Sequence, residues 1–342
     1  MLGSHCIAYN NNWADVFIKR FSKSEIESNR TKNQIILSHI CKRSFSQLLF
    51  SWNAFRPQKG YFTFFIKSRN AATKKWSKWH KMVDWGKNIQ RSYFSRDGNT
   101  KYVYVRLEAG PKALEDAFKI KLIACHGACL SLIKGVAVCS SDFNMFRPEK
   151  ISQKTVQLKS VYIKNVPKIS QRILDHPQPG RLCSPTSCSM LAAYCNKKPV
   201  DPVAFAYTAF DTGLNEYGSW PFNIAALFDI CKGRWFFYTA RLNGFGQLHK
   251  KLMAGVPVVV SVRGRLKGAQ NEYKNGHLLI VVGWDAKRKS VICHDPAFYS
   301  DKKTLVRYTL ESFLKAWERS RRLAYVAEPL SFSYIFNSKG GS

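Results

Sequence analysis

Between Gln34 and Ser141 the chain repeats short apolar stretches that are separated by polar turns. Several stretches alternate apolar and polar residues, as in Lys-Tyr-Val-Tyr-Val-Arg-Leu and Phe-Lys-Ile-Lys-Leu-Ile, and Arg-Asp-Gly-Asn is one of the turns. Alternation with a period of two is typical of strands with one buried face, and strands at this spacing favour two packed antiparallel sheets. We therefore expect a β-sandwich over residues 34–145.

A second pattern, typical of a helix, begins at Cys183 in the other half of the chain. Pro185 suits the first turn of a helix, where the N–H that proline lacks would have no intrahelical partner. The next apolar residues fall at i, i+3, i+4 and i+7, namely Cys188, Leu191, Ala192 and Cys195. That spacing predicts a helix with one apolar face, on which Cys188 and Cys195 are small core residues. Cys183 would lie at the helix N-terminus, where the helix dipole lowers the pKa of a thiol.

A buried strand that starts with a histidine is predicted in Gly-His-Leu-Leu-Ile-Val-Val-Gly-Trp, residues 276–284. A polar turn follows at 285–290, and Ser-Val-Ile-Cys-His is typical of a returning strand. A hairpin centred near Ala286 would place His277 directly opposite Asp295, with their Cβ atoms about 5 Å apart. We therefore expect the imidazole of His277 to contact the carboxylate of Asp295.

Cys183, His277 and Asp295 are the residue types of a cysteine hydrolase. Such an enzyme needs a thiolate that attacks, an imidazole that holds the proton and a carboxylate that orients the imidazole. Each residue alone is common in structural positions, so the prediction rests on their combination with the expected hairpin. The chemistry would be acyl transfer through Cys183. His294, next to Asp295, is expected on the opposite face of its strand and is the weaker candidate base.

Several motifs occur along the second half of the chain in a definite order. They are Val-Pro-Lys-Ile-Ser-Gln (166–171), Cys-Ser-Pro-Thr-Ser (183–187), Tyr-Gly-Ser-Trp-Pro-Phe-Asn (217–223), Ala-Gly-Val-Pro-Val-Val-Val-Ser-Val (254–262), the histidine strand (276–284), His-Asp-Pro-Ala (294–297) and the segment from Ser312 to Trp317. Together, over about residues 166–327, they resemble the papain-fold cysteine peptidases related to the bacteriocin-processing (double-glycine) peptidases. The resemblance implies a papain-like α+β fold, with no cofactor.

The resemblance also implies that a glutamine side chain donates to the oxyanion hole. Gln171 fits the Val-Pro-x-x-x-Gln motif, whereas Gln178 lies closer to the nucleophile, five residues before Cys183. Gln171 is the favoured donor and Gln178 the alternative. Ser184 stands where the family most often has glycine. Its side chain is expected to crowd the backbone near the oxyanion.

The net charge of +32 arises from Lys and Arg that are distributed along the whole chain. Such a field attracts anionic partners, such as an acidic polymer or a membrane surface, without specificity. No helix-turn-helix, zinc-finger or RNP-type motif accompanies the charge, so no specific nucleic acid is predicted. Trp76, Trp79 and Trp85 lie among lysines. They could form an exposed platform for sugars or bases, or could belong to the sandwich core and its edges.

Membrane and metal signals are weak in this sequence. No apolar run reaches about 18 residues, so no transmembrane helix is expected. The first residues lack the layout of a secretory signal, which leaves a cytoplasmic location or export by an unrecognised route open. Cys125-His126-x-x-Cys129 with Cys139 has too few well-spaced ligands for a zinc site, so no metal is predicted.

The chain is thus expected to join a β-sandwich to a papain-like cysteine peptidase domain that acts on a peptide or protein. The expected parts are a loosely ordered segment (1–33), an accessory sandwich (34–145), a connector (146–165), the peptidase domain (166–330) and a tail (331–342). Two other functions remain open at this point. One is an amidase or acyltransferase that uses the same site. The other is a non-catalytic binding protein that uses the basic, aromatic first half.

Overall fold

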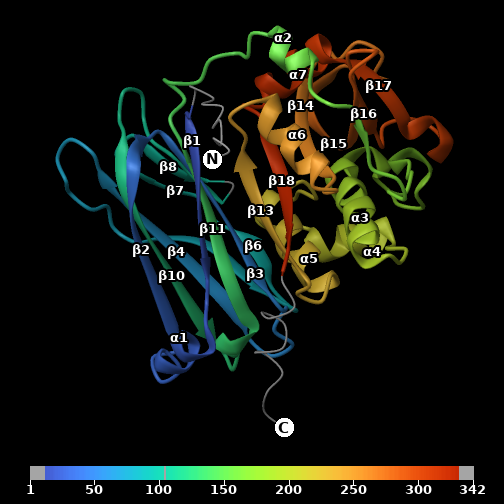
Figure 1. The fold of residues 1–342 in the computed structure, drawn as a ribbon. Helices are drawn as coiled ribbons and strands as arrows, with labels where there is room; N and C mark the ends of the chain where they lie inside the picture. Colours follow the sequence, from blue (N-terminus) through green and yellow to red (C-terminus); the bar gives the residue numbers. More distant parts are fainter. Residues whose placement is uncertain (1–11, 104, 331–342) are drawn as a thin grey trace, which may run out of the picture.

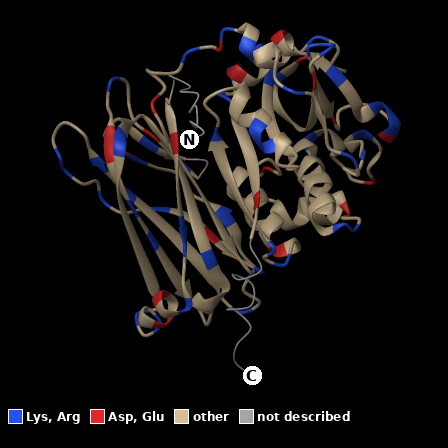
Figure 2. Ribbon diagram, in the orientation of Figure 1, with Lys and Arg blue, Asp and Glu red and all other residues tan. Residues whose placement is uncertain are grey.

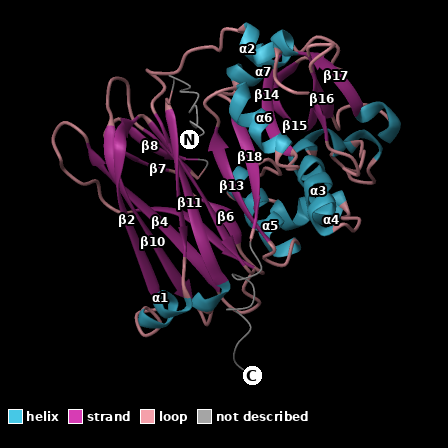
Figure 3. Cartoon of the chain, in the orientation of Figure 1, coloured by secondary structure: helices cyan, strands magenta, loops and turns pink. Residues whose placement is uncertain are grey.

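The computed structural model describes residues 12–103 and 105–330. It is a mixed α and β structure in which three antiparallel sheets are divided between two halves of the chain (Figure 1). The first half is almost entirely strands, and most of the helices lie in the second half (Figure 3). Among the described residues, no helix is both long and apolar enough to span a bilayer.

The first half forms two antiparallel sheets that share one apolar core. One sheet has the spatial order β1 (Ala14–Arg20), β11 (Ile133–Ser141), β3 (Gln47–Ala54), β9 (Arg106–Glu108), β8 (Thr100–Val103) and β7 (Ser95–Asp97). The other has the order β2 (Gln34–Phe45), β10 (Glu115–Cys125), β4 (Tyr61–Asn70), β5 (His80–Gly86) and β6 (Gln90–Ser92). Two short helices, α1 (Lys23–Ser28) and η1 (Leu130–Leu132), lie between strands. This is the sandwich architecture that the alternating strands predict.

Alternation along β4 shows why the two sheets pack together. Its inward residues are completely buried, namely Phe62, Phe64 and Ile66. Phe65 and Lys67 flank Ile66 and point to the opposite face, where they are partly exposed. Trp85 is completely buried and is a core residue, whereas Trp76 and Trp79 are half-buried. Of the three tryptophans that lie among lysines in the sequence, Trp85 is therefore a core residue, and Trp76 and Trp79 lie at the surface.

The start of the chain is more ordered than expected. The sequence placed residues 1–33 in a loosely held segment, of which residues 1–11 lie outside the described part of the chain, as does the expected tail at 331–342. Residues 14–20, however, form β1 and pair with β11 over their whole length. Helix α1 follows, and a capping box formed by Ser22 and Glu25 caps its N-terminus. Pairing along a sheet edge orders this segment, and its own pattern did not indicate that pairing.

The second half contains the third sheet and its covering helices. Its strands have the order β13 (Trp235–Arg241), β18 (Leu323–Pro329), β14 (Val258–Gly264), β15 (Tyr273–Asp285), β16 (Ser290–His294) and β17 (Leu305–Thr309), and β12 (Val161–Tyr162) pairs with β15. The α-helices are α2 (Gln153–Val156), α3 (Cys183–Asn196), α4 (Pro202–Ala209), α5 (Trp220–Ile230), α6 (Phe245–Met253) and α7 (Leu310–Arg319). Short 3₁₀ turns are η2 (Gln171–Ile173), η3 (Pro179–Arg181) and η4 (Asp301–Thr304).

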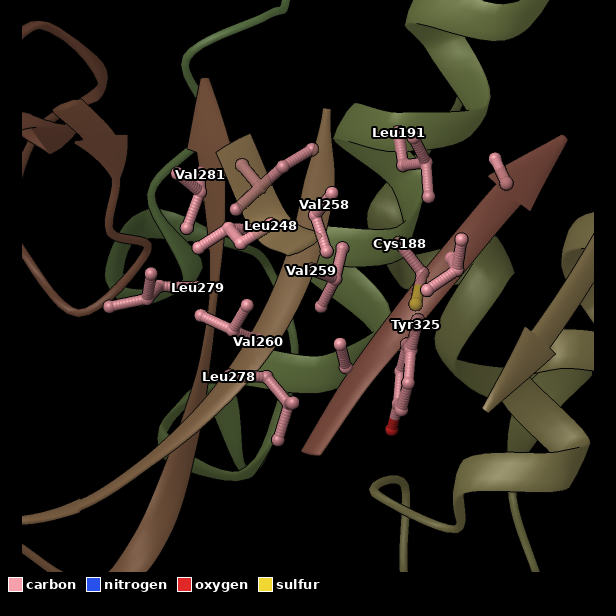
Figure 4. Close-up of a cluster of buried hydrophobic side chains, with 14 of the residues drawn as sticks. Cys188, Leu191, Leu248, Val258, Val259, Val260, Leu278, Leu279, Val281 and Tyr325 are labelled. Atoms are coloured by element: carbon pink, nitrogen blue, oxygen red, sulfur yellow. The ribbon is translucent and has the colours of Figure 1, made fainter. Parts of the chain in front are cut away.

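Helix α3 packs against the middle of the third sheet. Figure 4 shows Cys188 and Leu191 of α3 in one cluster with Tyr325 of β18 and the valines of β14. Cys188 and Leu191 are completely buried, as the helical spacing predicts. The helix differs from the prediction in having more than one buried face, because every residue from 184 to 193 is buried. A helix in the centre of a domain needs no solvent face, and its serine and threonine side chains are buried with the apolar ones.

The two halves are in direct contact along β3 and β13. The side-chain amide of Asn53 donates to the carbonyl of Phe237 (2.7 Å) and accepts from its N–H (2.8 Å). Phe222 of α5 meets Trp52 edge to face, with ring centroids 5.7 Å apart. Phe222 and Ala225 pack within the apolar core of the sandwich. Helix α5 therefore completes that core.

Candidate active site

Cys183 is the first residue of α3, as the sequence predicts. Leu182 is the N-cap residue, and Pro185 lies in the first turn. Cys183 is partly buried, and the helix behind it presents backbone N–H groups and the positive end of its dipole. These features favour a thiolate at Cys183.

His277 lies on β15 and points its ring at Asp295. The ring Nε2 is 2.7 Å from Oδ1 of Asp295. The ring of Tyr273, four residues earlier on the same strand, stacks on the imidazole with centroids 4.1 Å apart and planes 19° apart. Because Nε2 is engaged by Asp295, Nδ1 is the ring nitrogen left for the Cys183 thiol, with which His277 interacts.

The contact between His277 and Asp295 forms in a register that differs from the predicted one. Strand β15 pairs with β16 so that Ile280 lies opposite His294, and His277 instead pairs with Val262 of β14. The turn between β15 and β16 is centred later than Ala286, and the register shifts between Val281 and Gly283. Asp295 is therefore a diagonal neighbour of His277 on the same face, and not its direct partner. Side chains at diagonal positions still reach each other, so the expected contact is present.

The carboxylate of Asp295 is completely buried and accepts four hydrogen bonds. Oδ1 faces His277 and accepts from the Ala297 N–H at 3.0 Å. Oδ2 accepts from the hydroxyls of Tyr273 and Tyr308, each at 2.7 Å. Neither tyrosine was predicted from the sequence as a partner of Asp295. Tyr273 carried one usable signal, since its four-residue separation from His277 puts both side chains on the same strand face.

The three groups shift one another's pKa in the directions that an ion pair requires. Burial alone would raise the pKa of the Cys183 thiol, but His277, together with backbone hydrogen bonds from Leu278 and Ser184, lowers it below its ordinary value. Burial alone would lower the pKa of His277, but the charge and hydrogen bond of Asp295, with a contribution from Cys183, raise it to about 10. Burial would raise the pKa of Asp295, yet His277 and the other hydrogen-bond donors lower it. A thiolate and an imidazolium are thus the favoured pair.

The two candidate oxyanion donors have different surroundings. Gln171 is buried at the start of η2, and its Nε2 donates to the carbonyl of Pro179 at 3.0 Å. Gln178 is exposed, and its side-chain oxygen accepts from Arg181 at 2.8 Å. An amide nitrogen carries two N–H donors, so Gln171 can hold the Pro179 carbonyl and also donate to a substrate oxygen.

Ser184 points into the protein core. It is completely buried, and its hydroxyl lies 3.1 Å from the hydroxyl of Tyr325 on β18. The side chain that was expected to crowd the oxyanion backbone therefore contacts the sheet.

The other buried histidines of the second half bind the backbone or a tyrosine. His294 faces the carbonyl of Pro167 at 2.8 Å, and His249 faces the carbonyl of Lys159 at 2.7 Å. His176 lies 3.2 Å from the hydroxyl of Tyr217. Each has a structural partner, and His277 is the one of these four that contacts Asp295.

Comparison with known proteins identifies the second half of the chain. Residues 163–325 match the model of the Peptidase C39 like family. This segment is similar to that family. The match covers nearly all of the stretch from 166 to 327 and confirms the resemblance seen in the sequence motifs. Similarity to the C39-like peptidase family indicates a cysteine peptidase in general, and a peptidase family implies a peptide or protein substrate.

A crystal structure is also similar to part of this chain. It belongs to a protein from Bacillus anthracis assigned as a C39-like peptidase, which is 22% identical with a TM-score of 0.39. The similarity covers 51% of this chain and 99% of that chain. No curated protein matches the chain.

Proposed function

We propose that the protein is a cysteine peptidase with a papain-like domain, in which Cys183, His277 and Asp295 form the catalytic triad. The observation that carries this proposal is the orientation of the His277 ring. Its Nε2 binds a buried carboxylate, and its other nitrogen is left for a thiol at the N-terminus of a helix. That is the order of contacts that nucleophilic acyl transfer requires.

The residues support a two-stage reaction. The thiolate of Cys183 attacks the carbonyl carbon of the scissile bond, and a tetrahedral oxyanion forms. His277 then gives its proton to the leaving amine as the C–N bond breaks, which leaves an acyl-enzyme. A water molecule attacks the acyl carbon while His277 removes its proton, and the thiol leaves as the carboxylic acid product forms. Asp295 holds the imidazole in the orientation that both stages use.

Gln171 is the proposed side-chain donor to the oxyanion, with the Cys183 N–H as its partner. Its burial and its bond to Pro179, four residues before Cys183, support this role over the exposed Gln178. Loss of one oxyanion donor costs about 100-fold or more in kcat. We therefore expect Gln171→Ala to lower kcat by about that factor, and Gln178→Ala to leave kcat within about twofold of wild type. Steady-state hydrolysis of a peptide substrate measures both, and equal effects would contradict the assignment.

A thiol-directed probe tests the proposed nucleophile. Iodoacetamide labelling followed by peptide mass mapping should modify Cys183 fastest in the wild type. Labelling of Cys183 should slow sharply in His277→Ala, and Cys183→Ala should lose all peptide cleavage. The matched control is Cys129→Ala, because Cys129 is an exposed thiol whose pKa is also lowered, by the Ser131 hydroxyl. That variant should keep full cleavage.

The outcomes separate the alternatives. Equal labelling of Cys183 and Cys129, with cleavage intact in Cys183→Ala, would overturn the proposal. A cleavage profile over a peptide library then defines the substrate. Acyl-enzyme that is released faster by added amines than by water would instead identify an acyltransferase on the same site.

A further inference from the structure

The outer face of the sheet formed by β2, β10 and β4 has an unusual composition. Residues directly opposite each other on paired strands point to the same face. The register therefore defines three rows across this face: Ser38–Lys119–Lys67, Ile36–Lys121–Phe65 and Ile40–Ala117–Arg69. The opposite face of the same strands is the sandwich core, with Phe118 and Ile120 buried. Lysine, arginine, aromatic and isoleucine side chains therefore share the outer face. This set of rows, with Trp76 and Trp79, is called the basic face below.

Trp76 and Trp79 extend the basic face and hold its lysines in place. The Nζ of Lys67 lies 5.3 Å from the ring centroid of Trp76 and 5.0 Å from that of Trp79. Lys119 lies 4.9 Å from the Trp76 ring, and Lys121 lies 4.7 Å from the Trp79 ring. The ammonium groups thus stand over aromatic rings, a favourable arrangement for a cation.

Strands β2, β4 and β10, which form the basic face, contain more Lys and Arg than Asp and Glu (Figure 2). Within the described residues, the salt bridges of this region join Asp116 to Arg69 and Lys74, while Lys67, Lys119 and Lys121 form none. Lys42 is exposed on β2 itself, and Lys75 and Lys78 are exposed on the segment between β4 and β5. An anionic partner would therefore meet lysines that no carboxylate neutralises.

Two isoleucines indicate which anionic partner fits best. Ile36 is 52% exposed and Ile40 is 65% exposed, and both lie in the rows of the basic face. Branched aliphatic side chains contribute little to binding a nucleic acid, which needs flat rings and phosphate contacts. A bilayer gains from all three residue types, because aliphatic groups enter the interface, tryptophans lie at headgroup level and lysines contact anionic lipids.

We propose that the basic face binds the surface of a membrane containing anionic phospholipids. The sheet would lie along the bilayer, with Ile36 and Ile40 in the interface and with Lys67, Lys119 and Lys121 against the headgroups. This interaction would bring the peptidase half to a membrane without a spanning helix. The proposal is independent of the peptidase activity, because the basic face belongs to the first half of the chain.

Co-sedimentation with lipid vesicles tests this proposal on the full chain. Wild type should bind vesicles of phosphatidylcholine with phosphatidylserine at low salt, and should not bind vesicles of phosphatidylcholine alone. Lys119→Gln/Lys121→Gln should weaken binding about fivefold for each lysine. Ile36→Thr/Ile40→Thr keeps β-branched residues and charge, and should also weaken binding several-fold.

The control variant is Lys197→Gln/Lys198→Gln, which removes the same charge from an exposed position just after α3. It should bind vesicles like the wild type, and equal weakening by this pair would overturn the proposal in favour of a general charge effect. A single-stranded oligonucleotide is the competing ligand. Binding to it that requires Lys119 and Lys121, with vesicle binding unaffected by the isoleucine variant, would overturn the membrane assignment. Iodoacetamide labelling and thermal unfolding of each variant check that the chain remains folded.

Discussion

Two residues, Cys183 and His277, define how the candidate site should respond to pH. The thiol pKa is lowered and the imidazole pKa is raised to about 10, so the thiolate and imidazolium coexist between these values. Lowering the pH through the depressed thiol pKa protonates the nucleophile. Raising the pH through about 10 removes the imidazolium proton, which the leaving amine needs.

We therefore expect Cys183 to remain reactive at pH values below the ordinary thiol pKa of about 8.5. The rate of iodoacetamide alkylation as a function of pH measures this directly. In His277→Ala the acid limb should move to higher pH, because the cation that stabilises the thiolate is gone. A wild-type profile with a single transition near 8.5 would contradict the ion pair.

The tyrosines around Asp295 are the second feature at the residue scale. Tyr308 is 1% exposed and donates one of the two hydroxyl bonds to Oδ2. Removing a hydrogen bond to a charged group costs about 1.5–3 kcal/mol, which corresponds to roughly 10- to 100-fold in rate if it is expressed in the transition state.

Tyr308→Phe is therefore expected to lower kcat by about tenfold or more with little change in KM, because the hydroxyl orients Asp295 and touches no substrate. The control is Tyr162→Phe, at an exposed tyrosine on β12. The acid limb of the kcat profile should also move, since Asp295 loses a donor that stabilises its charged form. A variant with lower thermal stability but unchanged kcat and pH profile would show a purely structural role.

At this scale the sequence predicted the contact between His277 and Asp295 but not the tyrosine hydroxyls that bind Asp295. Cys183, His277 and Asp295 were proposed because one mechanism combines a thiol, an imidazole and a carboxylate, and their catalytic roles stay a proposal. Tyr308 was not, because tyrosine is common on strands and its hydroxyl reaches Asp295 only after β17 pairs with β16. The function of Gln171 stays a proposal.

At the scale of elements, α3 and β15 determine how the thiol meets the imidazole. The hydroxyl of Ser187 on α3 donates to the carbonyl of Leu278 at 3.0 Å, and Leu278 follows His277 directly on β15. The hydroxyl of Ser189 donates within its own helix, to Thr186 at 2.8 Å. Both are buried, so the two serines differ mainly in whether their hydrogen bond crosses from helix to strand.

Ser187→Ala and Ser189→Ala should each lower the free energy of unfolding by about 1 kcal/mol. Only Ser187→Ala should slow the alkylation of Cys183, because it removes a link between the two elements that hold the reacting groups. Chemical denaturation measures the first quantity, and iodoacetamide kinetics measures the second. Equal slowing in both variants would show that this link does not position the site.

A helix or strand was predictable where its own residues carry the periodic pattern. It was less predictable where pairing with another strand determines its register or its order. The helix from Cys183 and the strand through His277 follow from local spacing. The register of β15 and β16 does not, because the bulge between Val281 and Gly283 inserts a residue that alternation alone does not locate. The same holds for β1, which its pairing with β11 orders.

At the scale of the whole molecule, the first half of the chain forms hydrogen bonds with a loop of the second half. Asp211, in the loop between α4 and α5, is completely buried and accepts from the N–H of Ser92 (3.0 Å) and its hydroxyl (2.6 Å) on β6. Further along the same loop, Glu216 pairs with Arg181 of η3 at 3.3 Å. Because Cys183 follows η3 closely, the sandwich contacts a loop that packs beside the candidate site.

Asp211→Ala should therefore lower both stability and substrate binding. The buried donors of Ser92 would lose their acceptor, at a cost of about 3 kcal/mol in the free energy of unfolding. KM should rise several-fold, since the loop would lose its anchor on the sandwich. Asp175→Ala, at an exposed carboxylate, is the control and should change neither quantity. Unchanged KM with reduced stability would show that the loop lies outside the substrate site.

The position of Phe222 has a consequence for anyone who shortens this chain. A gene truncated to encode residues 166–330 would produce a segment in which Phe222 and Ala225 of α5 are exposed to solvent. Phe237 of β13 would also lose its hydrogen bonds with the side-chain amide of Asn53. Such a product should be recovered from inclusion bodies, and co-expression of the missing half as a separate polypeptide should restore it to the supernatant.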